Sequence, residues 1–259
     1  MRITTVINQK GGVGKTTTAH ALATGLTHKG HSVLCVDMDP QGNLSYTMGA
    51  NTSAAGLYEA MKGEATAGQV IQHTSQGDIL PSSLLLSAAD MEFTATGREW
   101  ILDSLLKPVK RAYSHIIIDS PPTLGILTIN ALTAGTDVVI PMGADIYSLQ
   151  GLSQLHRTIL KVRQFCNKDI KVAGLLMTRY NARTILSRDM YDGIAAKAAE
   201  VQSTLYNTVI REGVAVKEAQ TNQASLFDYA PQSNPAQDYA NFIQEYLEQS
   251  AAKGAIKHA

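Results

Sequence analysis

Short apolar runs alternate with segments of helical spacing along most of the chain. The runs are short and continuous, which is typical of strands that are buried on both faces of a parallel sheet. The predicted strands are residues 2–8, 32–36, 78–80, 115–118, 137–141 and 171–177. The predicted helices are residues 15–29, 128–134, 149–166, 185–201 and 238–250, with further, mostly helical structure over residues 50–110.

Strands that alternate with helices predict βαβ units, which build a parallel sheet covered by helices on both faces. The chain has 259 residues, enough for one sizeable core. We therefore predict an α/β fold: a single domain over residues 1–259 with a doubly wound, mostly parallel sheet. In such sheets ligands bind at the carboxyl ends of the strands. A glycine-rich loop, Asp39 and Asp119 all follow predicted strands.

Composition limits the possible binding partners and indicates the cellular compartment. The 22 basic and 22 acidic residues give a formal net charge of zero, so any nucleic-acid binding must come from a local patch. The two cysteines, Cys35 and Cys166, are far apart and form no CxxC motif, which indicates thiols in a reducing compartment. The sequence shows no signal peptide or membrane span, so the predicted location is the cytoplasm.

A glycine-rich loop, KGGVGKTT, occupies residues 10–17 between the first predicted strand and helix. It fits the phosphate-loop pattern G-x-x-x-x-G-K-[ST], except that Gln9 replaces the first glycine. Glycines let backbone N–H groups approach phosphate oxygens, and the helix that follows adds the positive end of its dipole. The predicted nucleotide contacts in the loop are Lys10, Gly11, Gly12, Val13, Gly14, Lys15, Thr16 and Thr17.

Three residues of this loop have distinct predicted roles. Lys15 supplies a point charge for the β- and γ-phosphates, and the Thr16 hydroxyl is a ligand of Mg²⁺. Lys10 leaves two interpretations open. It is either a solvated loop lysine or a cation that reaches phosphates, including those of a partner subunit. In the second case ATP would be part of a dimer contact.

Three segments together resemble the ParA/MinD family of deviant Walker A ATPases. KGGVGKTTT at residues 10–18 is similar to the family's phosphate loop, and VDMDPQGNLS at 36–45 to its first switch segment. IIIDSPPT at 116–123 is similar to its Walker B and second switch segment. Shorter matches to the small ParA branch occur at residues 127–132, 141–155 and 208–210. The resemblance covers nearly the whole chain and implies the P-loop NTPase fold, with ATP and Mg²⁺ as ligands.

The resemblance also assigns chemistry to the carboxylates at the strand ends. It implies that Asp39 positions or activates the attacking water, with Lys10 and Lys15 as the other catalytic residues. It implies that Asp119 holds Mg²⁺ through water, so that the metal ligands are Thr16, Asp39 and Asp119. The structural alternative for either aspartate is a helix N-cap, which is a common use of Asp at a strand end.

The backbone around these carboxylates indicates a switch. Asp37 lies two residues before Asp39, and we interpret it as a supporting residue. Pro40 and the pair Pro121-Pro122 restrict φ beside the predicted nucleotide. Stiff segments next to a γ-phosphate suit two arrangements, one ordered by contacts with the phosphate and one released by hydrolysis.

One segment departs from the family's pattern. The ParA branch commonly reads IPRNVR where this chain has IREGVA at residues 210–215. The resemblance places base contacts at Arg211 and Gly213, and the departure predicts that contacts on the adenine side differ. The altered segment also lacks a basic residue that the family often uses at its DNA-binding edge.

Basic residues in the second half of the chain are candidates for DNA contacts. The candidates are Arg179, Arg183, Arg188 and Lys217. Their contacts with the DNA backbone would be salt-sensitive and independent of base sequence. The alternative is that these side chains are ordinary solvated charges.

The resemblance implies an ATP-dependent switch that partitions a plasmid, a chromosome or another mobile element. It implies a homodimer around ATP and non-specific DNA on the nucleoid as a partner. It also implies a ParB-like or centromere-binding adaptor that stimulates a slow hydrolysis. A ParA-like positioner of protein cargo is an alternative that the sequence does not separate from DNA partition.

Two further alternatives fit the sequence less well. A MinD-like ATPase on a membrane surface uses a basic amphipathic C-terminal helix. Residues 238–249 are acidic, and residues 251–259 are mildly basic but hardly amphipathic, so no membrane partner is predicted. An iron–sulfur reductase needs cysteines after the switch strands, whereas Cys35 lies inside a predicted strand and Cys166 at a helix end.

Overall fold

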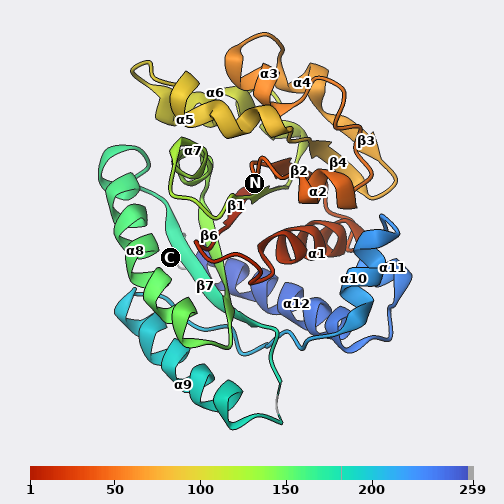
Figure 1. Cartoon of the computed structure of the whole chain (residues 1–259), viewed down its shortest axis with the longest axis vertical. Coiled ribbons are helices and arrows are strands. Elements are labelled where there is room, and N and C mark those ends of the chain that lie inside the picture. The colour runs from red at the N-terminus through yellow and green to blue at the C-terminus, as the bar shows by residue number, and fades with distance from the viewer. Residues whose placement is uncertain (182, 256–259) are drawn as a thin grey trace.

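The computed structural model describes residues 1–181 and 183–255, which fold around one sheet (Figure 1). Its seven strands follow the order β3-β4-β2-β5-β1-β6-β7. Neighbouring strands are parallel, except that β3 and β4 form an antiparallel hairpin. The strands are β1 (Arg2–Val6), β2 (Val33–Asp37), β3 (Gln72–Thr74), β4 (Gly77–Leu80), β5 (His115–Asp119), β6 (Asp137–Gly143) and β7 (Lys171–Thr178).

The predicted doubly wound, mostly parallel sheet is confirmed. Each of the six predicted strands is present, with ends that differ by a few residues from the prediction. The prediction missed β3, a three-residue edge strand with the polar sequence QHT. A short polar edge strand carries no apolar pattern, because one of its sides faces no neighbouring strand.

The helices match the predicted ones and add several short ones. The α-helices are α1 (Lys15–His28), α2 (Asn43–Thr47), α3 (Leu57–Lys62), α4 (Ala67–Val70), α5 (Ala89–Glu92), α6 (Ile101–Leu106), α7 (Ile126–Ala134), α8 (Ile146–Phe165), α9 (Ile185–Glu200), α10 (Val214–Thr221), α11 (Leu226–Tyr229) and α12 (Asn234–Ala255). Three 3₁₀ turns are η1 (Leu84–Ala88), η2 (Arg98–Trp100) and η3 (Lys110–Ala112).

Two differences in the helices matter below. α12 begins at Asn234, four residues before the predicted start, because Pro235 suits the first turn of a helix. The prediction missed α10, whose eight residues begin directly after the altered segment that contains Gly213. Among the described residues, no helix combines the length and apolar character needed to cross a membrane. The last residues of the predicted basic tail, 256–259, lie outside the described part.

Helices cover both faces of the sheet (Figure 1). Successive side chains of a strand point to opposite faces, so Ile116 and Ile118 of β5 pack with α3, α4, α6 and α7, whereas Ile117 packs with α1 and α12. A third apolar cluster joins β6 and β7 to α8 and α9. Burial on both faces explains why these strands are apolar throughout.

The carboxyl ends of the three central strands lie side by side. The register pairs Val6 of β1 with Asp119 of β5, and Asp119 with Asp37 of β2. The phosphate-loop segment follows β1, and the segment with Asp39 follows β2. The topology therefore brings the three predicted motifs to one edge of the sheet, as expected for a parallel α/β fold.

Candidate nucleotide-binding site

The phosphate loop connects β1 to α1 and has the backbone that its glycines allow. Gly12 has φ 73° and Gly14 has φ 81°, conformations in the left-handed region that side chains with a Cβ disfavour. Gly14 immediately precedes α1, and its carbonyl accepts a hydrogen bond from the Thr18 N–H at 2.8 Å. The loop thus ends on the N-terminus of a 14-residue helix, where backbone N–H groups and the helix dipole favour an anion.

Lys15 is folded back over this loop. Its Nζ donates to the carbonyl oxygen of Lys10 at 3.1 Å, and the residue is only 7% exposed. Burial lowers the pKa of Lys15, while the nearby carboxylates of Asp119 and Asp39 oppose that shift. The ammonium group therefore faces the carboxylate edge of the site and is poised at the loop that would wrap a phosphate.

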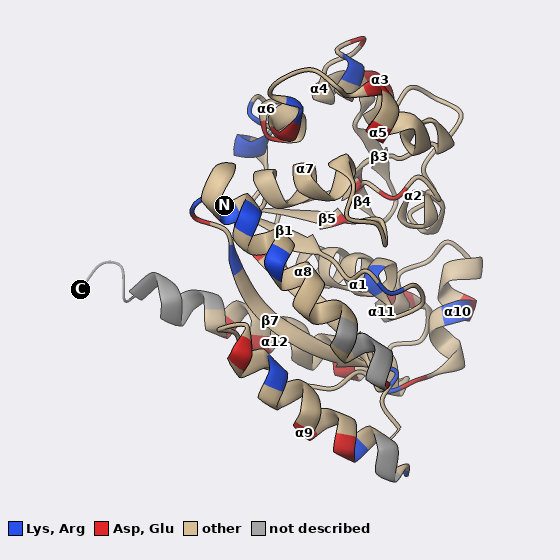
Figure 2. Ribbon diagram, turned by 60° about the vertical axis from the view of Figure 1, so that its left-hand side comes forward, with Lys and Arg blue, Asp and Glu red and all other residues tan. Residues whose placement is uncertain are grey.

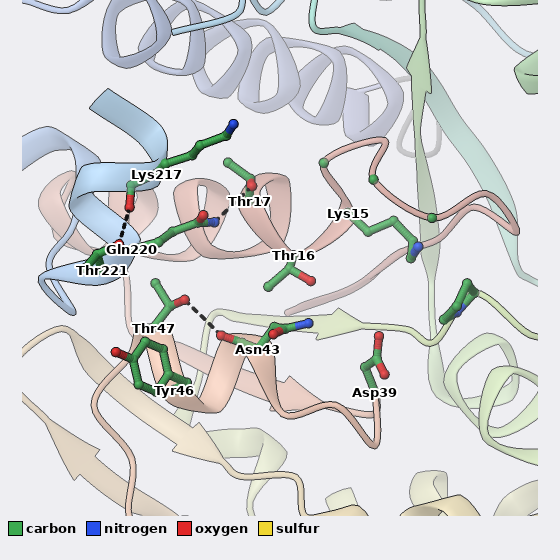
Figure 3. Close-up of a pocket in the computed structure, with 14 residues that line it drawn as sticks. Lys15, Thr16, Thr17, Asp39, Asn43, Tyr46, Thr47, Lys217, Gln220 and Thr221 are labelled. Atoms are coloured by element: carbon green, nitrogen blue, oxygen red, sulfur yellow. Dashed lines mark hydrogen bonds between the residues drawn. The ribbon is translucent and has the colours of Figure 1, made fainter. Parts of the chain in front are cut away.

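A cavity of about 550 Å³ lies over the loop and the start of α1 (Figure 3). In Figure 3, Lys15 and Asp39 point toward one another across one end of this cavity. The lining residues are Gly11, Gly12, Gly14, Lys15, Thr16, Thr17, Asp39, Asn43, Tyr46, Thr47, Pro122, Lys217, Gln220 and Thr221. Six of the eight predicted loop contacts are among them. The other two are Lys10 and Val13; the Val13 side chain is buried, and its carbonyl accepts from Thr178 Oγ1 at 2.8 Å.

Asp37 stabilises the first switch segment through hydrogen bonds that its carboxylate accepts. One carboxylate oxygen accepts from both the N–H and the hydroxyl of Ser45, at 2.8 and 2.7 Å, and the other accepts from the Asp39 N–H at 3.1 Å. Complete burial raises the pKa of Asp37 to about 6, although these hydrogen bonds favour the charged form. Since its oxygens are used inside the segment, Asp37 fixes the start of α2 and the position of Asp39.

Asp39 faces the cavity and does not cap a helix. Its Oδ1 accepts from the Gln41 N–H at 3.0 Å, its backbone carbonyl accepts from Ser82 Oγ at 2.6 Å, and α2 is preceded by Gly42. Asp39 is 7% exposed and lines the cavity. The N-cap alternative is therefore wrong for this residue.

Asp119 has two buried oxygens without a hydrogen-bond partner. Burial and the neighbouring Asp37 raise the pKa of Asp119 well above its usual range; the Thr16 hydroxyl opposes the shift but makes no hydrogen bond that satisfies either oxygen. Asp119 does not cap α7 either, because the Ile126 N–H at the start of that helix donates to Asp90 Oδ1 at 2.6 Å. An orphaned carboxylate behind a phosphate loop fits a bound cation.

The donor set suits Mg²⁺ that is shared with a phosphate. Thr16 and Asp39 line the cavity in front of Asp119. Across the described residues, no three His, Cys, Asp or Glu side chains gather into a complete metal site. Mg²⁺ commonly takes one or two protein oxygens and completes its octahedron with phosphate oxygens and water. These residues therefore fit an ion that arrives with a nucleotide.

Lys10 forms an ion pair within its own chain. Its Nζ contacts Asp145 Oδ1, and its N–H donates to Asn8 Oδ1 at 3.0 Å. Asp145 directly precedes α8. The interpretation as a merely solvated lysine does not fit this arrangement. Nothing in the sequence pattern singles out Asp145.

A second cavity, about 310 Å³ in volume, adjoins the loop where the altered segment lies. Arg211 and Gly213 both line it, together with Glu212 and Val216. The Arg211 guanidinium is held by Asp238, with Nε at 2.9 Å from Oδ2, and this carboxylate raises the pKa of Arg211. Arg211 and Gly213 therefore lie beside the phosphate loop, and the arginine side chain is bound to Asp238 of α12.

Two of the four DNA candidates line the cavity beside the phosphate loop, and the other two lie before and on α9. Arg179 has φ 54°, its Nη1 donates to the Gly12 carbonyl at 3.3 Å, and it pairs with Glu212 at 3.1 Å, so it belongs to the loop region. Lys217 lines the nucleotide cavity. Arg183 and Arg188 are exposed before and on α9. Figure 2 shows acidic and basic positions interspersed along α9, whereas α8 displays basic residues.

Several lining residues escaped the sequence interpretation. They are Asn43, Tyr46, Thr47, Gln220 and Thr221. Asn43 lies within the segment that resembles the first switch, and Tyr46 and Thr47 lie just after it, which was a usable signal. Gln220 lies in α10, and its Nε2 donates to Thr17 Oγ1 at 3.1 Å. The missed helix α10 thus accounts for two of the missed residues, Gln220 and Thr221.

Comparison with known proteins agrees with this geometry. Residues 1–172 match the protein family described as an AAA domain. The sporulation initiation inhibitor protein Soj of Bacillus subtilis is 37% identical, over 94% of this chain and 97% of its own. The chromosome partitioning protein ParA of Caulobacter vibrioides is 34% identical, over 95% of this chain and 94% of its own.

Solved structures are similar in fold as well as in sequence. Cobyrinic acid a,c-diamide synthase from Mycobacterium smegmatis with bound ADP and magnesium has a TM-score of 0.82 and 32% identity, over 97% of this chain and 96% of that chain. The parallel sheet and the loop at its carboxyl edge define the class, a P-loop nucleoside triphosphatase fold. Within this class, the chain belongs to the ParA/Soj family of ATPases.

Proposed function

We propose that this protein is an ATP-dependent switch that partitions DNA and that hydrolyses ATP to ADP and phosphate at the carboxyl edge of its sheet. The observation that carries the proposal is the buried, orphaned carboxylate of Asp119 next to Thr16 and Lys15, which both line the cavity. That arrangement leaves room and charge for Mg²⁺ and a triphosphate. Relatives named Soj and ParA support partition as the process.

Each residue of the site has a place in this proposal. The loop amides and Lys15 bind the phosphates, and Thr16 together with Asp119 holds Mg²⁺, which neutralises charge on the phosphate oxygens when bound. Asp39 orients the attacking water, because its carboxylate faces Lys15 across the cavity (Figure 3). The M. smegmatis structure, which contains ADP and magnesium, supports a nucleotide and Mg²⁺ as the bound ligands.

The switch follows from how Asp39 is held. Its carbonyl is bound by Ser82, and the Ser82 N–H donates to Ser45 Oγ at 2.9 Å, so the segment before η1 and the start of α2 share one hydrogen-bonded unit with Asp37. A terminal phosphate bound beside Asp39 would order this unit. The loss of that phosphate on hydrolysis would release it, as in other phosphate-sensing switches.

Dimer formation in this proposal involves Lys10. Its ammonium is bound to Asp145 in the single chain, and it must leave that carboxylate to reach phosphates bound by a second copy. A cation supplied across an interface stabilises charge in phosphoryl transfer. A homodimer would therefore assemble only when ATP replaces Asp145 as the counter-charge.

The partners belong to the same proposal. Non-specific DNA would bind through basic side chains such as Arg183 and Arg188, and a ParB-like or centromere-binding adaptor would stimulate hydrolysis. Protein cargo in place of DNA is the alternative, and a mobility shift with random duplex separates the two. A location on the nucleoid within the cytoplasm follows if DNA is the partner.

The proposal is tested with Asp39→Ala. The variant is expected to bind Mg-ATP with nearly unchanged affinity and to lose turnover by about 10²-fold or more, because only the water-positioning group is removed. Asp103→Ala, which removes a surface partner of Lys107, is the control and should retain turnover. Binding is measured by calorimetry and turnover by phosphate release. An Asp39→Ala variant with wild-type turnover would contradict the assignment.

A further inference from the structure

The nucleotide cavity has two walls that come from distant parts of the chain. Figure 3 shows their side chains on two separate helices around the start of α1. These are Asn43, Tyr46 and Thr47 of α2, and Lys217, Gln220 and Thr221 of α10. The helices have five and eight residues, too few to be stable without support from neighbouring structure. The spacing of the two walls must therefore be set by contacts outside the cavity.

Gln76 supplies such contacts from the turn between β3 and β4. Its Nε2 donates to the carbonyl of Thr47 at 2.7 Å, at the last residue of α2, and to the carbonyl of Gln223 at 2.9 Å, just after α10. Its Oε1 lies 2.8 Å from His20 Nε2 on α1. One half-buried amide thus touches both walls and the helix between them.

The amide has a single arrangement that satisfies all of its partners. Two carbonyls must accept, so Nε2 faces them, and Oε1 is left to accept from the ring of His20. His20 is 4% exposed, and burial lowers its pKa, so its ring is neutral and carries the proton on Nε2. An amide with its polar atoms satisfied and partly shielded from water fixes geometry more strongly than an exposed one.

The residue that accepts from Gln76 just after α10 has an unusual backbone conformation. Gln223 has φ 48°, a left-handed conformation that costs on the order of 1 kcal/mol for a residue with a Cβ. Its N–H donates to the Gln220 carbonyl at 3.1 Å, and its own side chain donates to the carbonyl of Tyr46 at 2.9 Å. Two separate hydrogen bonds, from Gln76 and from Gln223, therefore tie the end of α10 to the last turn of α2.

We propose that Gln76 is a positioning residue of the ATPase site, which sets the distance between the α2 and α10 walls and thereby the affinity for nucleotide. It contacts neither the phosphate loop nor the catalytic carboxylates. Its substitution should therefore loosen the walls and leave the chemistry intact. The inference rests on the proposed nucleotide site and adds to it a residue that lies outside the cavity.

The test compares Gln76→Leu, Gln76→Glu and a matched control, Gln72→Leu. Gln72 is in the same hairpin and is also half-buried, but its amide pairs with the backbone of Asn51. Both Gln76 variants should raise KM for ATP about tenfold and change kcat by about twofold or less, since they remove two donated bonds from the walls. Glu keeps an acceptor for His20 but presents oxygens to both carbonyls.

Further readouts separate positioning from a general loss of stability. Gln72→Leu should lower the unfolding temperature much as Gln76→Leu does and leave KM unchanged. Gln223→Gly keeps the carbonyl and the positive φ but loses the bond to Tyr46. It should raise KM by a few-fold alone and by less in a Gln76→Leu background, because the two bonds act on the same contact. Gln223→Gly and Gln76→Glu carry the test if Gln76→Leu does not fold.

The outcomes are distinct. Wild-type KM in both Gln76 variants, or an equal rise in Gln72→Leu, would overturn the positioning role while the proposed ATPase stands. A loss of kcat without a change in KM would overturn it too, because it would place Gln76 in the chemistry. A wild-type protein that binds no ATP would contradict the proposed function and this inference with it.

Discussion

Replacing Asp119 with asparagine should make the empty protein more stable and the liganded protein less so. Asp119 is completely buried, both of its oxygens lack partners, and Asp37 and Asp39 add like charge. Without a cation, this carboxylate is a destabilising group that the fold retains at its functional site. An amide of the same shape removes the charge and the ligand together.

The magnitude follows from the cost of an unsatisfied buried group. Removing the charge should raise the free energy of unfolding by about 1–3 kcal/mol, which for a chain of this size is a rise in Tm of roughly 2–10 °C. Burial raises the pKa of Asp119, so in the folded protein the stabilising protonated form is lost as pH rises. The gain from asparagine should therefore be larger at about pH 8 than at about pH 6.

With Mg-ATP bound, the wild-type protein should be more stable than the Asp119→Asn variant. Mg-ATP at a thousand times its Kd stabilises a protein by about 4.1 kcal/mol, more than the gain from asparagine, and the variant should show little of this shift because an amide is a poor Mg²⁺ ligand. Thermal unfolding with chelator and with Mg-ATP measures both effects. Asp90→Ala, which removes the hydrogen bond at the start of α7, is the control and should lower Tm by similar amounts in both conditions.

Two results would refute this reasoning. If Asp119→Asn were less stable than wild type in chelator, the carboxylate would have an unrecognised partner in the folded state. If the variant kept the full Mg-ATP shift, the ion would be bound elsewhere. The predicted crossing, with the variant above wild type when empty and below it with Mg-ATP, requires both the burial and the ligand role.

Three further predictions concern other parts of the molecule. Lys15→Ala should weaken ATP binding by about 10²-fold or more in calorimetry, since the buried ammonium at the loop is lost; affinity within about threefold of wild type would contradict this. His115 is 6% exposed, and burial with nearby His31 and Arg2 lowers its pKa to about 4 from 6.5. Between these two pKa values the unfolded chain binds more protons than the folded protein. The free energy of unfolding therefore falls by about 1–3 kcal/mol as pH drops through this window. His115→Gln should flatten the dependence of urea midpoints on pH, and an unchanged slope would count against it. Charge reversal at Arg183 and Arg188 should weaken ATP-dependent shifts of random DNA and reduce their salt dependence; shifts equal to wild type would place the DNA surface elsewhere.

Much of the fold could be predicted because the central strands are buried on both faces. Runs such as residues 116–118 of β5 are apolar, so their pattern is unambiguous, and the parallel order brings the carboxyl ends of the strands together. The edge strand β3 and the short helix α10 carry no comparable pattern. Their positions depend on tertiary hydrogen bonds, such as those of Gln76, which sequence spacing does not encode.

In the candidate site, too, some residues could be predicted from the sequence and others could not. The loop, Asp39 and Asp119 could be placed from motifs, because chemistry fixes residue types at strand ends. The pairing of Arg179 with Glu212 and of Arg211 with Asp238 could not, because each joins residues that lie 27 or more positions apart. The sequence therefore did not predict that Arg179 and Lys217, both DNA candidates, line the second cavity beside the phosphate loop.

The central claim is that the terminal phosphate of ATP controls assembly through the Lys15 loop and its neighbouring carboxylates. Sedimentation velocity of the wild-type protein with Mg-ATP, with Mg-ADP and without nucleotide tests it most directly. The account predicts a dimer with Mg-ATP and a monomer in the other two samples. The same sedimentation coefficient in all three samples would contradict it.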